Sequence, residues 1–205
     1  MRVPTTLYAD LICPFCYLAA FPFGRLRAEG LIDLRVRPFE IHPETPREGI
    51  DLEALDGKAK AKVDEVWRSL QWLAGEAGVE IRRPSRLPQS RLALEALEMA
   101  RAAKGDAGAV DFMGRAFGAY FREGADLADE ALLRGIADQV GVPRPLQEKC
   151  FLGRAFGPSV DAARREAEDA MVTAVPGGVV GGFPVVGYQA YPQLKKLVER
   201  AGKRA

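Results

Sequence analysis

The first forty residues place apolar runs and turn signals in the order strand, helix, strand. Residues 3–12 form a largely apolar run that predicts a buried strand centred on 5–9. Residues 17–29 carry apolar side chains at helical spacing and end at Gly30, a residue type that commonly terminates helices. Residues 34–39 alternate apolar and polar positions, which is typical of a strand. This order predicts a right-handed parallel β-α-β unit.

The central part of the chain predicts helices only. Residues 41–56 are rich in proline, glutamate and glycine, which is typical of a linker. After this linker the apolar positions recur at helical spacing, and most of the runs end at a glycine. Asp129 has the side chain and the position of a helix N-cap. The expected helices cover residues 58–77, 90–104, 109–122, 130–140 and 145–154.

The pattern becomes mixed again near the C-terminus. A helix is expected over residues 159–172, with Ser159 as its N-cap. Residues 177–187 predict a hairpin whose turn is Gly181-Gly182, because glycine readily adopts the positive φ angles of a tight turn. A closing helix is expected over 192–201. An all-helical block therefore separates two α/β segments.

The composition narrows the classes of partner and compartment. The chain of 205 residues has a formal net charge of +1, which gives no electrostatic basis for a nucleic-acid or anionic-membrane partner. No apolar run approaches the length that spans a bilayer, and the first residues lack the pattern of a secretory signal. We therefore expect a cytoplasmic protein, and in reducing surroundings a cysteine pair is more often catalytic than structural.

Two of the three cysteines stand where the first predicted strand gives way to the first helix. Cys13 precedes the helix, where unpartnered backbone N–H groups and the helix dipole stabilise a thiolate. Cys16 lies one turn later, so that the pair can close and reopen as a disulfide. The alternatives are two structural thiols or half of a zinc site, but the other candidate ligands, Cys150 and His42, are far apart in the sequence. The spacing and the position favour a redox dithiol.

Other residues have both a functional and a structural interpretation. Val175–Pro176 precedes the hairpin, where a cis bond would present backbone N–H and C=O groups to an extended peptide, although a trans turn proline is the commoner case. Asp10 could move the proton of Cys16 or could cap N–H groups at the strand end. His42 is expected to be a solvated loop residue, and Cys150 a buried structural thiol.

Four segments, at residues 10–17, 39–49, 119–129 and 174–182, occur in an order shared with a known family. They contain DLICPFCY, FEIHP followed by PREG, AYFREG, and AVP followed by a Gly-Gly turn. Together they resemble the DsbA-like thioredoxin-fold oxidoreductases, with the FrnE-like branch most similar. The resemblance implies an α/β, thioredoxin-like fold with an all-helical insertion. Its thioredoxin-like domain would comprise residues 1–55 and 156–205, and its helical insertion domain residues 56–155.

The resemblance also implies roles for the site residues. Cys13 would be the attacking thiol, Cys16 the buried resolving thiol, and Pro176, after Val175, a cis-proline that faces them. Pro14 and Phe15 separate the cysteines, and Phe15 stands where the family often has Trp or His. Phenylalanine brings no donor or positive charge to the thiolate, so we expect a milder oxidant than a CPHC enzyme. The Gly177-Gly178 pair replaces larger residues and is expected to leave space beside the dithiol.

The expected function is thiol–disulfide exchange on protein or peptide substrates. No metal or organic cofactor is implied, and glutathione is a candidate redox partner. Two alternatives remain: a glutathione-dependent transferase or isomerase of the kappa and hydroxychromene-carboxylate isomerase type, or a peptide-binding chaperone-like module. The former branch has Ser at the position of Cys13 and needs no second thiol, so the intact pair disfavours it. The residues leave the direction of exchange and the oligomeric state open.

Overall fold

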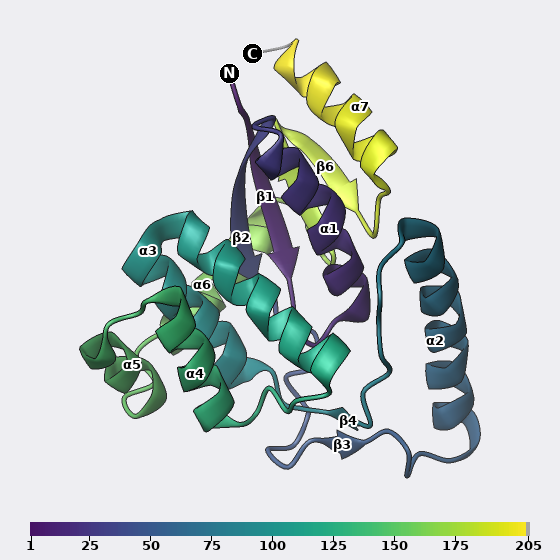
Figure 1. Cartoon of the computed structure of the whole chain (residues 1–205), viewed down its shortest axis with the longest axis vertical. Helices are drawn as coiled ribbons and strands as arrows, with labels where there is room; N and C mark the ends of the chain where they lie inside the picture. The colour runs from purple at the N-terminus through teal and green to yellow at the C-terminus, as the bar shows by residue number, and fades with distance from the viewer. Residues whose placement is uncertain (204–205) are drawn as a thin grey trace.

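Strands from both ends of the chain form one four-stranded sheet. The computed structural model describes residues 1–203. β1 (Val3–Ala9) pairs in parallel with β2 (Ile32–Pro38), and β5 (Gly177–Val180) pairs antiparallel with β1 and with β6 (Phe183–Val186). The resulting order is β2-β1-β5-β6 (Figure 1). The predicted β-α-β unit and hairpin are confirmed, and the fold is the thioredoxin-like α/β fold with added helices.

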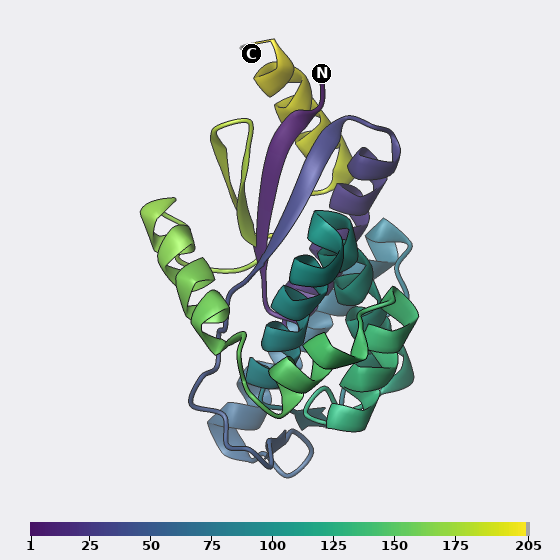
Figure 2. The same cartoon turned by 90° about the vertical axis from the view of Figure 1, so that its left-hand side faces the viewer.

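Helices cover both faces of this sheet. α1 (Pro14–Ala28) and α7 (Tyr191–Gly202) lie on one face, and α6 (Gly157–Asp169) lies on the other (Figure 2). α6 begins two residues before the predicted Ser159 and ends three residues before the predicted end. Its first turn contains Pro158, whose fixed φ angle and missing N–H suit the start of a helix, so the proline decides the start rather than the serine.

The remaining helices come from the middle of the chain. They are α2 (Gly57–Ala77), α3 (Arg91–Gly118), a π-helical turn η1 (Ala119–Glu123), α4 (Glu130–Val140) and α5 (Arg144–Phe151). α3 consists of two helical segments that meet at a kink, because the backbone of Gly105 is not helical there (φ +66°, ψ −162°), so the predicted break between two helices at this glycine is confirmed. The predicted cap is confirmed, because Asp129 accepts a hydrogen bond from Ala131 N–H (2.8 Å).

A short ribbon lies where the sequence predicts only linkers. β3 (Ile50–Asp51) pairs antiparallel with β4 (Arg86–Leu87), so the segments before and after α2 lie side by side (Figure 1). Two-residue strands carry no periodic signal, which is why the pattern missed them. Within residues 1–203 no helix has the length and apolar composition needed to cross a membrane.

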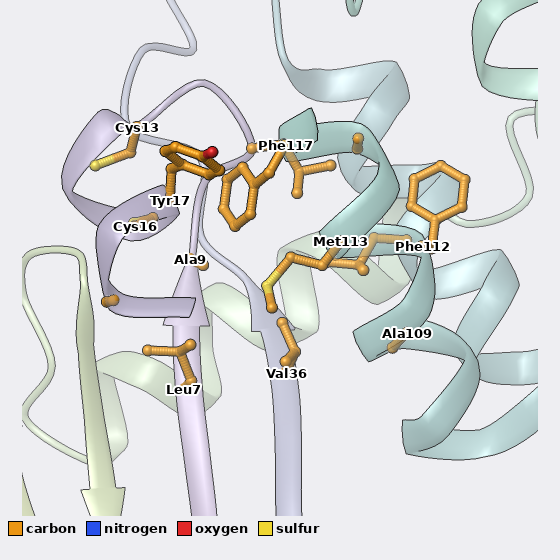
Figure 3. Close-up of a cluster of buried hydrophobic side chains, with 14 of the residues drawn as sticks. Leu7, Ala9, Cys13, Cys16, Tyr17, Val36, Ala109, Phe112, Met113 and Phe117 are labelled. Carbon is orange, nitrogen blue, oxygen red and sulfur yellow. The ribbon is translucent and has the colours of Figure 1, made fainter. Parts of the chain in front are cut away.

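A continuous hydrophobic core joins the sheet to the helical block. The ring of Tyr17 on α1 stacks on Phe121 (5.1 Å between centroids) and meets Phe117 edge-on (5.8 Å). Figure 3 shows Tyr17 and Phe117 side by side above Leu7 and Val36 of the sheet. Because side chains of both parts fill one core, the division of the chain at residues 55/56 and 155/156 stays a prediction.

Gly177 and Gly178 do not leave space beside the dithiol, contrary to the sequence-based expectation. Both glycines are buried in β5. A Cβ on Gly177 would overlap the carbonyl oxygen of Ala174, and one on Gly178 would overlap the carbonyl oxygen of Thr6. The volume that larger side chains would fill is occupied by neighbouring backbone and, at Gly177, by the side chain of Val172. Gly178 therefore permits a close approach of β5 to β1, and Gly177 a close approach to the segment that precedes the strand.

Gly178→Ala is expected to lower the free energy of unfolding by about 1–3 kcal/mol, because the added methyl group meets rigid backbone rather than a movable side chain. Urea unfolding followed by circular dichroism measures the change. Gly114→Ala is the matched control, because its Cβ would meet nothing within 4 Å and the residue lies inside α3. This control should keep or raise stability by up to about 1 kcal/mol. Equal effects of the two substitutions would contradict the packing argument.

Candidate active site

The first cysteine of the pair begins α1. Cys13 is the N-cap residue of this helix, with extended backbone angles (φ −83°, ψ 115°), and Pro14 lies in the first turn. The N–H of Cys13 donates to the carbonyl of Asp10 (3.1 Å), and the N–H of Tyr17 donates to the carbonyl of Cys13 (3.1 Å). The Cys13 sulfur is therefore held at the positive end of the helix. Figure 3 shows Cys13 and Cys16 on this turn, just beyond the end of β1.

A loop from the far end of the chain closes over Cys13. The thiol of Cys13 donates to the carbonyl of Val175 (3.9 Å), a residue 162 positions later in the chain. The Val175–Pro176 peptide bond is cis, and the carbonyl of Pro176 accepts a hydrogen bond from Gly187 N–H (2.8 Å). β5 starts at the following residue, so its pairing with β1 fixes the loop. The structure thus brings Cys13, Val175 and Pro176 together.

The second cysteine is fully buried behind the first. Both cysteines are free thiols. The pKa of Cys16 is raised well above its usual value, first by burial and then by a hydrogen bond and charge interaction with Cys13. A hydrogen bond from the backbone of Asp10 acts in the opposite direction, whereas the negative charge of the Asp10 carboxylate adds to the rise. Cys16 therefore needs help to lose its proton.

Asp10 is a fully buried carboxylate between β1 and the dithiol. It accepts hydrogen bonds from Ile41 N–H (2.8 Å), Ser90 Oγ (3.1 Å) and Ile12 N–H (3.3 Å). Burial raises its pKa from 3.8 to about 6, and the three hydrogen bonds limit the rise. Asp10 thus caps local N–H groups, the structural interpretation that its sequence position allowed. It is also a carboxylate that changes protonation state close to neutral pH.

An apolar groove of about 440 Å³ adjoins the active-site turn. Ile12 and Pro14 contribute one wall, and Trp67 of α2 contributes another. Tyr120 and Phe121 of η1 also line the groove, so these two aromatic side chains contribute to a surface as well as to the core. Ile50 and Leu52, which lie in the segment predicted as a linker, line the groove as well.

The remaining predicted residues lie in different surroundings. His42 is partly exposed and contacts Glu44 (2.9 Å), as expected of a loop residue, but it also lines the groove beside Pro14, which its distance in sequence did not indicate. Phe15 is half-buried and packs on the core. Cys150 is buried in α5, and burial raises its pKa to about 12. In the described part of the chain, no three His, Cys, Asp or Glu side chains gather as metal ligands.

Sequence reasoning missed Ser90 and the backbone of Ile41, the two partners of Asp10 outside the active-site turn. Ser90 precedes α3, and Ile41 follows β2, so neither lies near the cysteines in the sequence. The only available signal was the serine before a periodic helix, which normally indicates an N-cap.

The comparison with protein families decides the classification. The family model of the DSBA-like thioredoxin domain matches residues 6–199, which include the dithiol, the helical block and the cis-proline loop. The chain belongs to this family. The family assignment confirms the resemblance that the four sequence segments indicated, at the level of the DsbA-like group.

Known proteins are similar to this family member over 98% or more of its length. The uncharacterized protein YwbO of Bacillus subtilis is 26% identical over 209 residues and is covered completely. Among solved structures, the probable DsbA oxidoreductase SCO1869 of Streptomyces coelicolor superposes with a TM-score of 0.83 at 20% identity, covering 100% of this chain and 92% of its own. A 2-hydroxychromene-2-carboxylate isomerase gives 0.79 at 20% identity, covering 98% and 97%. The cytosolic disulfide reductase DsbM of Pseudomonas aeruginosa, solved with GSH, gives 0.72 at 15% identity, covering 98% and 99%.

Proposed function

We propose that this DsbA-like protein is an enzyme that exchanges thiols and disulfides on protein or peptide substrates. The observation that carries the proposal is the Cys13 thiol, held at the N-terminus of α1 and hydrogen-bonded to Val175 next to the cis bond. Cys16 lies buried one turn away. Cys13 itself is only 4% exposed, and the backbone of the Val175 loop lies against its thiol. A thiol at a helix N-terminus, a fully buried second thiol and an adjacent peptide backbone are the elements that disulfide exchange on a polypeptide uses.

The exchange proceeds in two balanced steps. The Cys13 thiolate attacks a substrate disulfide, forms a mixed disulfide and releases one substrate thiolate. Cys16 then gives up its proton and attacks the Cys13 sulfur, which closes the Cys13–Cys16 disulfide and releases the second substrate thiol. The substrate is reduced and the enzyme oxidised, and the reverse path oxidises a substrate dithiol. Asp10 is the proposed acceptor of the Cys16 proton, because both groups are fully buried at this turn and the charge of the Asp10 carboxylate acts on that thiol.

Glutathione is the proposed source of reducing equivalents, and the cytoplasm is the proposed place of action. The similarity to a cytosolic disulfide reductase solved with GSH supports both proposals. The FrnE-like branch of the family is the proposed subgroup. The reaction needs no metal or organic cofactor, since the two sulfurs carry the electrons.

A glutathione-dependent isomerase or transferase is the second candidate. The apolar groove beside Pro14 and the similarity to a 2-hydroxychromene-2-carboxylate isomerase favour it. Such a reaction does not use a second thiol. Glutathione-dependent turnover of a small apolar substrate that survives Cys16→Ser, with no reduction of a peptide disulfide by the wild type, would therefore select this candidate over disulfide exchange.

Equilibration in glutathione redox buffers is expected to give a reversible Cys13–Cys16 disulfide. The thiols are trapped with an alkylating agent and counted by mass spectrometry. We expect a reduction potential more negative than the roughly −120 mV of a strong DsbA oxidant, because Phe15 provides no charge or donor to stabilise the thiolate. Cys150→Ala is the control and should leave the potential unchanged. Failure to form the disulfide at any ratio of the buffer would refute the proposed function.

A further inference from the structure

The hydroxyl group of Ser90 does not make the bond that its position suggests. Ser90 precedes α3 as its N-cap residue, yet its side chain makes no capping hydrogen bond. The residue is fully buried, and Oγ donates instead to Oδ2 of Asp10 (3.1 Å). Serine at this position normally satisfies an N–H of the helix it precedes. Here the hydroxyl joins the start of the helical block to the carboxylate beside the dithiol.

We propose that Ser90 is a positioning residue for disulfide exchange, which holds Asp10 in the ionised form that accepts the Cys16 proton. The proposal rests on the proposed function. It concerns the resolving step alone, in which the S–S bond between Cys13 and the substrate breaks and the bond between Cys13 and Cys16 forms. The proton moves from Cys16 to Asp10 and then to the departing substrate thiolate.

The contacts of Asp10 explain why one hydroxyl matters. Ile41 N–H and Ser90 Oγ share Oδ2, whereas Oδ1 accepts only the longer bond from Ile12 N–H. These bonds favour the carboxylate, and burial opposes it. Because Asp10 is fully buried, bulk solvent cannot supply a donor in place of the lost Ser90 hydroxyl.

The charged and titratable neighbours of Asp10 do not compensate for this loss. Glu40, which follows β2, raises the pKa of Asp10 by charge repulsion. Cys16 on α1 and Tyr120 on η1 interact with the Asp10 charge, and each has its own pKa raised by it. The charge of Glu40 therefore opposes ionisation of Asp10, and the charge of Asp10 opposes ionisation of Cys16 and Tyr120. Burial raises the pKa of Asp10 most, and the groups that lower it are its three hydrogen-bond donors, the N–H groups of Ile41 and Ile12 and the hydroxyl of Ser90.

The rate of the resolving step against pH tests the proposal. The reduced full-length protein is mixed with excess oxidised glutathione and quenched in acid at intervals. Mass spectrometry then separates the Cys13–glutathione mixed disulfide from the closed disulfide. Ser90→Ala is expected to move the acidic limb of the resolution rate upward by about one pH unit, which slows resolution about fivefold at pH 6 and leaves it unchanged near pH 8. Formation of the mixed disulfide should keep its profile.

Three variants separate this effect from a structural one. Ser90→Thr keeps a hydroxyl, so its resolution rate should fall at the same acidic pH as that of the wild type. Thr45→Val removes another buried hydroxyl, one without a hydrogen-bond partner in residues 1–203, and should leave the pH profile of the resolution rate unchanged. Ser90→Ala added to Asp10→Asn should cause no further shift, because the acceptor is gone.

A measurement without turnover completes the test. Carbon-13 NMR of the Asp10 carboxyl in the reduced protein should show a midpoint about one pH unit higher in Ser90→Ala. An unmoved midpoint, or a rate lowered equally at every pH, would overturn the role of Ser90 while leaving disulfide exchange intact. A dithiol that never closes in the wild type would overturn the proposed function as well.

Discussion

Cys13→Ser is expected to reduce disulfide exchange to the background rate of glutathione alone. A serine hydroxyl at the start of α1 is not ionised near neutral pH and cannot form a mixed disulfide. Cys16→Ser should behave differently: the first step continues, and when the protein is mixed with the peptide disulfide alone, without glutathione, the mixed disulfide on Cys13 accumulates because no resolving thiol is present. Reduction of a disulfide-linked fluorescent peptide by glutathione measures the rate, and mass spectrometry of the acid-quenched protein detects the mixed disulfide.

The two variants also separate an enzyme from a chaperone-like module. Cys150→Ala is the control, because this thiol lies buried in α5 away from the pair, and its exchange rate should match the wild type. A chaperone-like module would suppress aggregation of a test protein equally with and without Cys13. Exchange that persists in Cys13→Ser would assign the reaction to another thiol and contradict the proposed mechanism.

Asp10→Asn is expected to gain stability over the wild type as the pH rises. The pKa of Asp10 is about 6 in the folded chain and 3.8 when the residue is fully solvated, so the folded state holds the proton more tightly. The contribution of this group to stability is therefore complete below pH 3.8 and is lost as the pH rises through 6. The loss amounts to about 3 kcal/mol. Asparagine has no proton to lose and avoids this cost.

The difference between the two unfolding curves measures the effect. Urea unfolding is followed at a series of pH values, and the free energy of unfolding of Asp10→Asn minus that of the wild type should rise by about 3 kcal/mol from pH 3 to pH 7. Paired surface carboxylates such as Glu29 and Asp64, whose pKa values are lowered, give the opposite slope in both proteins and cancel. Asp33→Asn on the surface is the control. A difference that stays constant with pH would contradict the burial argument for Asp10.

Local physics made much of this fold predictable. Helix ends coincide with glycines such as Gly78 and Gly141, which adopt positive φ angles that other residues avoid, and Asp129 caps α4 as its side chain predicted. The Gly181-Gly182 turn of the hairpin also follows from neighbouring residues. Errors arose where two local signals compete, as with Ser159 and Pro158, or where an element is too short for a period, as with β3 and β4.

The sequence by itself determined the dithiol and its place at a helix start, because Cys13, Pro14 and Cys16 act within a single turn. Only the tertiary structure decided what surrounds the pair. It brought Val175 to Cys13, placed Ser90 and Ile41 on Asp10, and pressed β5 against β1 so that Gly178 needs to be glycine. These contacts join residues far apart in the chain, and no spacing rule encodes them. Their effects on acidity depend on burial, which arises only when the whole chain packs.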